Sequence, residues 1–165
     1  MKNSTMETER LSLSLLTLDE TDFMFELLNT PEWIRFIGER NIRTKADAAA
    51  YIQKIADNPT ADYWGVKLKD TATPIGVVTF MKRDYLDHYD IGYAFLPQYG
   101  KKGYAHEASK RLFDEIKNDH STILATVLKE NKNSIQLLEK LGLRFDKEII
   151  INNEPLQLYR IALRK

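Results

Sequence analysis

The feature that most constrains this chain is the regular exchange of strand-like and helix-like segments along its 165 residues. Leu11–Leu15 alternates leucine with serine, and this period of two is typical of a strand with one buried face. Residues 103–118 instead place apolar side chains along one stripe at helical spacing. Chains that alternate in this way bury the apolar sides of their helices against a sheet. We therefore expect a mixed α/β (α+β) fold.

The other elements are bounded by turn and cap residues in the same manner. Strands are predicted at residues 11–15, 64–68, 75–81, 87–96, 122–128, 143–151 and 156–163. Helices are predicted at residues 20–28, 32–37, 45–56, 103–118 and 132–141. No repeat or Gly/Ser linker divides the chain, and its length is typical of one domain. We expect a single domain over residues 1–165.

Charge and composition exclude several classes of function. The 24 basic and 24 acidic side chains cancel, whereas sequence-independent nucleic-acid binding needs a basic excess. With 0 cysteines, thiolate metal sites and thiol nucleophiles are ruled out, and His88, His106 and His120 lack the spacing of metal ligands. Met1–Arg10 has no signal-peptide core, and no apolar run is long enough to span a membrane. We expect a cytoplasmic protein without nucleic-acid, membrane or metal partners.

The junction between the strand at 87–96 and the helix at 103–118 has the chemistry of an anion-binding site. A loop that contains Gly100, Gly103 and two lysines leads into the helix. Free N–H groups and the positive end of the helix dipole attract anions at a helix start, and glycines allow close approach of the backbone. A pyrophosphate would suit this loop, although an ordinary strand-to-helix turn with two solvated lysines would have the same sequence.

Two motifs together resemble the GNAT family of N-acetyltransferases. Residues 100–105 are similar to the acetyl-CoA pyrophosphate loop of that family, [RQ]-x-x-G-x-[GA], with Gly100 where Arg or Gln is usual. Residues 130–143 resemble the second signature, E-N-x-x-[AS] followed by Y-x-K-x-G-F, with Leu138 in place of the Tyr. Residues 8–36 resemble the opening of the ribosomal-protein N-terminal acetyltransferase branch, so the resemblance covers nearly the whole chain.

This resemblance implies a fold and a cofactor. The sheet would be mostly antiparallel, with helices on both faces and a V-shaped splay between two central parallel strands, Asp87–Leu96 and Thr122–Leu128. Acetyl-CoA would lie in the V as co-substrate, with its pantetheine arm on the backbone of Phe95 and Leu96. Asn131 would contact the cofactor or the adjacent strand while also capping its helix. The pyrophosphate would be held by Lys101, Lys102, Gly103, Tyr104 and Ala105.

Two residues are candidates for the proton transfers. Many relatives use a Tyr at the position of Leu138 to protonate the departing thiolate, whereas the ribosomal-protein branch is thought to use a serine, and Ser134 occupies its position. A serine there also satisfies a helix N–H without any catalytic role, and an ordered water is the alternative acid. Asp90, on the small-residue face of its strand, is the candidate general base, with Glu39 as the alternative. An exposed strand acid without function would give the same pattern at Asp90.

The acceptor would be an amine. Trp33, Phe36 and Glu39 are candidate acceptor-binding residues, with Tyr85 as a further wall, although aromatic residues at such spacing more often belong to the core. A neutral amine would attack the thioester directly in a ternary complex, because no cysteine is available for an acyl-enzyme. We expect a protein or peptide N-terminal α-amine. A small-molecule amine (polyamine, amino acid or aminoglycoside) and a non-catalytic acyl-CoA sensor are the alternatives, and the protein would be a monomer or a homodimer.

Overall fold

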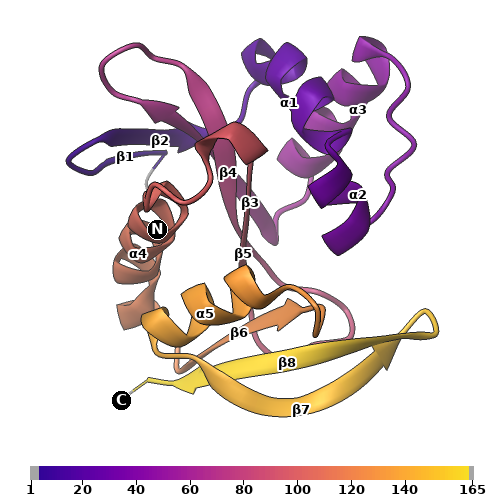
Figure 1. Ribbon diagram of the computed structural model, residues 1–165, viewed down its shortest axis with the longest axis vertical. Coiled ribbons are helices and arrows are strands. Elements are labelled where there is room, and N and C mark those ends of the chain that lie inside the picture. Colours follow the sequence, from indigo (N-terminus) through magenta and orange to yellow (C-terminus); the bar gives the residue numbers. More distant parts are fainter. Residues whose placement is uncertain (1–3, 164–165) are drawn as a thin grey trace.

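The computed structural model describes residues 4–163, and these form one eight-stranded sheet (Figure 1). The strand order is β1-β2-β3-β4-β5-β6-β8-β7. All neighbours are antiparallel apart from β5 and β6. The strands are β1 (Thr5–Glu7), β2 (Leu11–Leu15), β3 (Ala61–Leu68), β4 (Pro74–Met81), β5 (Asp90–Phe95), β6 (Thr122–Val127), β7 (Arg144–Ile151) and β8 (Glu154–Ala162).

The parallel pair β5–β6 opens into a V. The two strands pair only where Asp90 lies opposite Leu124. There the Leu124 N–H donates to the Tyr89 carbonyl at 3.0 Å. Beyond this point they diverge, whereas β5 stays paired with β4 along its whole length. The backbone of β5 after Asp90 therefore has no strand partner on its β6 side, and the predicted splay is confirmed.

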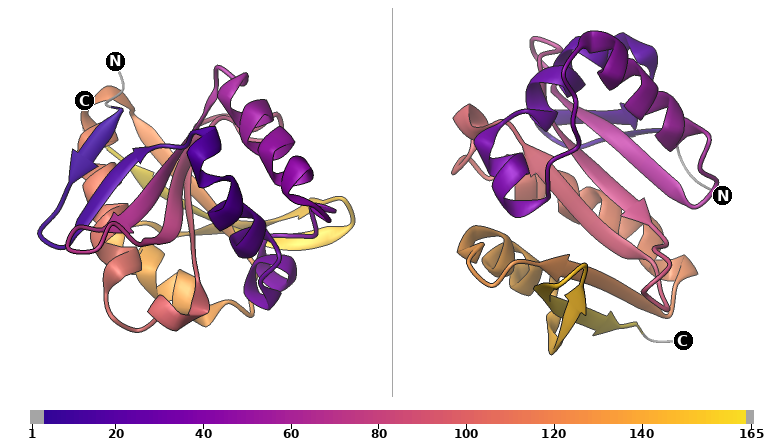
Figure 2. Two further views of the ribbon diagram at one scale, coloured as in Figure 1. Left: turned by 90° about the horizontal axis from the view of Figure 1, so that it is seen from above. Right: turned by 90° about the vertical axis from the view of Figure 1, so that its right-hand side faces the viewer.

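Helices cover both faces of the sheet (Figure 2), as the sequence predicts. The first three helices share an apolar cluster with Val77 and Leu96, and the last two share another with Ile91 and Ile123. The helices are α1 (Thr21–Leu28), α2 (Pro31–Phe36), α3 (Lys45–Ala56), α4 (Tyr104–Ile116) and α5 (Lys132–Leu141). Within residues 4–163, no helix is both long and apolar enough to cross a membrane.

Element boundaries follow local sequence signals. Thr44 and Asp47 form a reciprocal capping box at the start of α3, and Gly142 ends α5 with φ of 105°. Four boundaries differ from prediction by two residues or more. Strand β3 begins at residue 61 rather than 64, and β8 begins at 154 rather than 156. Strand β5 begins at 90 rather than 87, because a bend occupies residues 87 and 88, and α4 ends at 116 rather than 118. Strand β1 was not predicted. It has only three residues, of which Met6 alone is buried, too few for a periodic pattern.

Gly76 of β4 lies against β5 with no room for a side chain. An added Cβ would stand 2.4 Å from Cδ2 of Phe95 and 2.7 Å from the carbonyl oxygen of Ala94. We expect Gly76→Ala to lower the free energy of unfolding by about 1–3 kcal/mol, the usual range for overpacking, as measured by urea unfolding. Gly65→Ala is the control, because its nearest neighbour is the flexible end of Leu16 at 3.2 Å. Equal losses in the two variants would contradict the steric explanation.

Candidate active site

A cavity of about 820 Å³ opens where β5 and β6 diverge, a volume within the range of roughly 300–1,000 Å³ that is usual for ligand sites. Residues 93–96 line one wall, and residues 125–128 with the first turn of α5 line the other. The lining also includes the first turn of α4 and, from the opposite side of the molecule, α2 and the connection between β4 and β5. A long ligand can therefore be held at several points along one cavity.

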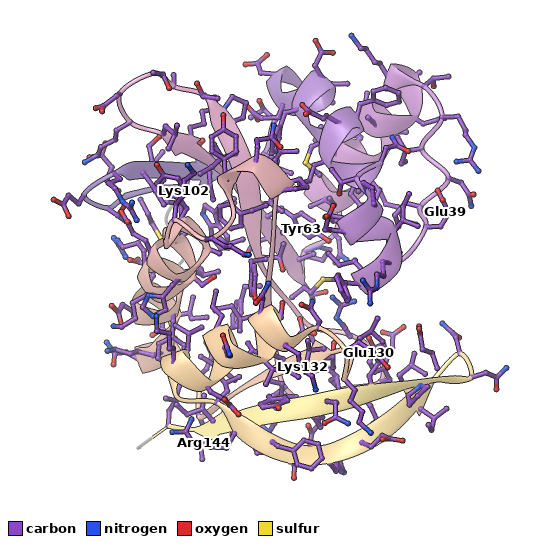
Figure 3. All side chains as sticks on the ribbon, viewed as in Figure 1. Glu39, Tyr63, Lys102, Glu130, Lys132 and Arg144 are labelled. Carbon is purple, nitrogen blue, oxygen red and sulfur yellow. The ribbon has the colours of Figure 1, made fainter. Side chains whose placement is uncertain are left out.

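The N-terminus of α4 offers backbone donors to this cavity. Gly103 precedes the helix with φ of 83°, a left-handed conformation that glycine adopts without strain. No side chain caps the helix, and the Glu107 N–H is the first to bond within it, to the Gly103 carbonyl at 3.0 Å. The preceding N–H groups are available to an anion. Lys101 lines the cavity, whereas exposed Lys102 does not and lies beside the start of α4 (Figure 3).

Arg10 supports the start of α4 from the far end of the sequence. Its guanidinium lies 4.4 Å from the centre of the Tyr104 ring and binds Oε1 of Glu107 through Nε and Nη2, each at 2.7 Å. The Thr8 hydroxyl and the Arg10 N–H donate to the other carboxylate oxygen. Although burial opposes the effect, these hydrogen bonds hold the pKa of Glu107 below its ordinary value. Arg10 thus offsets a carboxylate that stands next to the anion site.

We expect Arg10→Met to weaken CoA binding by about threefold, because an uncompensated charge near a helix terminus is worth roughly 0.3–1 kcal/mol. Isothermal titration calorimetry at low salt measures the change. Adding Glu107→Gln to this variant removes the unpaired carboxylate and should restore most of the affinity. An effect that persists in the double variant and in 1 M salt would show that Arg10 acts through packing rather than charge.

Asn131, Ser134 and Tyr93 meet at the N-terminus of α5. The Asn131 side chain caps the helix by accepting from the Ser134 N–H at 3.4 Å. The Tyr93 hydroxyl donates to Oγ of Ser134 at 2.7 Å. All three line the cavity, and Figure 3 shows the neighbouring Glu130 and Lys132 at this end of α5. Tyr93 and Ser134 are 41 positions apart, so their contact has no local signal in the sequence.

Asp90 is a buried acid, not an exposed strand residue. Its side chain is 4% exposed and accepts from Nε of Arg83 at 2.6 Å, at the base of the V. Burial raises the pKa of the Asp90 carboxyl, although the Arg83 charge opposes the rise. A raised pKa makes a carboxylate a better proton acceptor. Both residues line the cavity, so the position is compatible with a general base.

Aromatic side chains line the end of the cavity formed by α2. Trp33 is buried, and its Nε1 has no hydrogen-bond partner within residues 4–163. Phe36, Tyr63 and Tyr85 complete this wall, with Tyr63 between α2 and α5 in Figure 3. Burial and the neighbouring Tyr51 raise the pKa of Tyr63, which keeps its hydroxyl protonated. This end of the cavity can therefore hold an organic group against uncharged aromatic side chains.

Glu39 is separate from these residues. Its carboxylate accepts from the Asn41 N–H at 2.8 Å and pairs with Arg43 at 3.3 Å, and in Figure 3 it lies on the outer side of the chain. The structure thus gathers into one cavity most of the residues that the sequence singled out, without Glu39 and Lys102. Those that line it are Trp33, Phe36, Asp90, Phe95, Leu96, Lys101, Gly103, Tyr104, Ala105, Asn131 and Ser134.

Comparison with known proteins identifies the family of this fold and cavity. The protein-family model of the acetyltransferase (GNAT) domain matches residues 10–144 of this chain. The chain belongs to the GNAT acetyltransferase family. It is 32% identical over 165 residues to the uncharacterized N-acetyltransferase YnaD of Bacillus subtilis, covering 94% of each chain. This GNAT protein is therefore an N-acetyltransferase with acetyl-CoA as its acetyl donor, and the resemblance seen in the two motifs is confirmed.

Solved structures agree with this assignment. A GNAT-family acetyltransferase from Bacillus anthracis aligns with a TM-score of 0.79 at 26% identity, over 96% of this chain and 98% of the other. The ribosomal-protein-S5-alanine acetyltransferase of Vibrio fischeri aligns with a TM-score of 0.80 at 18% identity, over 97% of each chain. At that identity the second match shows a shared fold. The GNAT fold expected from the sequence is thus confirmed.

Proposed function

We propose that this GNAT enzyme acetylates the N-terminal α-amine of a protein or peptide by direct attack on acetyl-CoA. The observation that carries the proposal is the single cavity that joins three features: the uncapped start of α4, the unpaired edge of β5, and the aromatic wall at α2. An acyl donor held at the first two features would present its thioester to an amine that enters past the third. The protein has 0 cysteines, so no cysteine acyl-enzyme can form, and we propose that the acetyl group passes directly between the two substrates.

The cofactor fits the residues of the first two features. The free N–H groups before Glu107, with Lys101 beside them, suit a pyrophosphate. The β5 edge beyond Asp90 has backbone donors and acceptors for an extended pantetheine arm, as a strand partner would use them. The Leu96 N–H already donates to the Ile75 carbonyl at 2.9 Å. We therefore expect the Phe95 N–H to polarise the thioester carbonyl; one such donor is typically worth about 2.7–4 kcal/mol in the transition state.

The proton transfers fall to the residues at the base and wall of the V. Asp90 accepts the proton that the attacking nitrogen loses, with Arg83 keeping its carboxylate ionised and oriented. Ser134 donates a hydrogen bond to the departing thiolate from the opposite wall, or positions a water that does so. A thiol of ordinary acidity, with a pKa of about 8.5, needs only modest help to leave.

The charges around the aromatic wall favour an α-amine over a polyamine. Glu32 and Asp90 are matched there by Arg40 and Arg83, and all four line the cavity. A polycation would need an acidic excess, which this balance does not supply. The spermidine N-acetyltransferase of Vibrio cholerae shares the fold at 18% identity, so a small amine remains the second candidate.

The acceptor class can be tested by amine acidity. Near pH 7.5 an α-amine with a pKa of about 7.7–8.0 is substantially neutral, whereas a lysine with a pKa of about 10.4 is almost fully protonated. We expect peptides beginning with Ala or Ser to show a higher kcat/KM than N-blocked peptides bearing only lysine, with a rate that rises through about pH 7–8 and then levels off. Faster turnover of the blocked peptides or of spermidine would contradict the proposal.

A non-catalytic acyl-CoA sensor would behave differently from either enzyme. It would bind CoA tightly yet release none from acetyl-CoA with any member of a mixed-amine panel. Size-exclusion chromatography with light scattering would separate the monomer from the homodimer, both of which fit the proposed function.

A further inference from the structure

Tyr93 and Ser134 place two hydroxyl groups in contact in the wall of the cavity. Tyr93 extends from β5 and Ser134 from the first turn of α5, and the donor–acceptor distance is 2.7 Å. A hydroxyl carries one hydrogen and two acceptor lone pairs. Because Tyr93 directs its hydrogen at Ser134, the hydrogen of Ser134 is free for a ligand in the cavity that both residues line.

We propose that Tyr93 is a positioning residue that fixes the Ser134 hydroxyl as a hydrogen-bond donor to the sulfur of CoA. The inference rests on the proposed function, in which this sulfur departs past Ser134. When the tetrahedral adduct collapses, the C–S bond breaks and its electron pair stays on sulfur, where Ser134 donates. The nitrogen loses one proton as the amide forms, and the thiolate later gains one from solvent. The reaction therefore balances without consuming either hydroxyl.

Tyr93 is suited to orienting a donor and unsuited to giving up its own proton. Burial raises the pKa of its hydroxyl to about 12, whereas a thiol titrates near about 8.5. The proton would thus favour the tyrosine over the thiolate by more than about a thousandfold. Donation from Tyr93 instead polarises the O–H bond of Ser134, because linked hydrogen bonds strengthen one another. A hydrogen bond to an ionised sulfur is the charge-assisted kind that gains most from this.

The first test needs no acceptor amine. The affinity of CoA is compared with that of desulfo-CoA, which lacks the sulfur, by calorimetry between pH 6.5 and 9.5. His106, Lys140 and Asp90 also line the cavity, and desulfo-CoA is the reference for their charges acting on the rest of the CoA molecule. In the wild type the ratio of affinities should rise with pH by about tenfold or more, as expected for a hydrogen bond to a charged group, and then level off above the pKa of the free thiol.

Removing the Tyr93 hydroxyl should remove most of this rise. In Tyr93→Phe and in Ser134→Ala we expect less than a third of the wild-type increase. Tyr89→Phe is the matched control, because Tyr89 lies four residues earlier and stacks on Phe80 at 4.9 Å outside the cavity lining; it should behave as wild type. A flat ratio in the wild type, or a Tyr93→Phe ratio equal to wild type, would overturn the inference.

A kinetic cycle supplies the second test. Tyr93→Phe should lower kcat by about tenfold, with the KM for acetyl-CoA changed less than about twofold. The double variant Tyr93→Phe, Ser134→Ala should have the same kcat as Ser134→Ala alone, since Tyr93 acts through Ser134. If the kcat losses of the two single variants multiply in the double variant, the positioning role is wrong. The affinity ratio of CoA to desulfo-CoA could rise with pH in a Tyr93-dependent way although no amine is acetylated. In that case the proposed function is wrong, whereas the role of Tyr93 at the sulfur is supported.

Discussion

Replacing Gly103 with Glu is expected to weaken acetyl-CoA binding by at least about tenfold, or ~1.4 kcal/mol, in a protein that remains folded. The new carboxylate would lie directly before α4, where the uncapped N–H groups are available to bind an anion. Repulsion between it and a pyrophosphate adds to the loss of space. Calorimetric titration with acetyl-CoA measures the change, and circular dichroism verifies the fold.

Two controls separate the contributions to this effect. Gly103→Ala imposes the same backbone strain at φ of 83° without a charge, so it should account for only a minor share of the loss. Lys102→Glu adds a carboxylate one position earlier, outside the cavity lining, and should weaken binding far less. Unchanged affinity in folded Gly103→Glu would mean that the phosphates bind elsewhere.

Truncating Ser134 to Ala should reduce kcat by about a hundredfold, the lower end of what losing one preorganised hydrogen-bond donor to developing charge usually costs. The hydroxyl acts on charge that develops as the C–S bond breaks, so kcat should fall far more than the KM for acetyl-CoA rises. Steady-state kinetics with a saturating peptide amine separates the two parameters. The substitution keeps the backbone N–H that Asn131 caps, so α5 itself should be unaffected.

The structural role of Ser134 has a different signature. If it only completes the first turn of α5, Ser134→Ala would retain wild-type kcat and at most lose thermal stability. The exposed neighbour Lys132 offers a control on the same turn, because it does not line the cavity, and Lys132→Ala should leave both kcat and KM unchanged. A wild-type kcat in Ser134→Ala would assign the donor role to a water.

Features encoded by local patterns could be predicted from the sequence. The start of α4 depends on the glycine before it, and the start of α5 on the Asn131 cap, so the starts of both helices could be placed from the sequence. The buried strands β4 and β5 also follow from runs of apolar residues bounded by turns. Strands β5 and β6 pair at one position and then diverge. Nothing in the sequence of either strand distinguishes this arrangement from two strands that stay paired. The V was therefore expected from the family resemblance and not from periodicity.

Contacts between distant segments account for what sequence reasoning missed. Arg10 meets Glu107 across 97 positions, and Tyr93 meets Ser134 because the fold brings the first turn of α5 beside β5. For Glu39 the reverse holds: it is close in sequence to a cavity residue but does not line the cavity. It follows Phe36 closely in sequence, but Gly38 and Asn41, with φ of 129° and 57°, turn the chain so that its carboxylate binds the loop itself.

The most direct measurement of the central claim uses one peptide with both kinds of amine. A peptide that begins with Ser or Ala and contains an internal lysine is incubated with the enzyme and acetyl-CoA, and tandem mass spectrometry locates the acetyl group. The account predicts acetylation of the N-terminal nitrogen, with CoA released in equal amount and with strongly reduced yield in Ser134→Ala. Acetylation of the lysine instead, or tight CoA binding with no acetylated product, would contradict it.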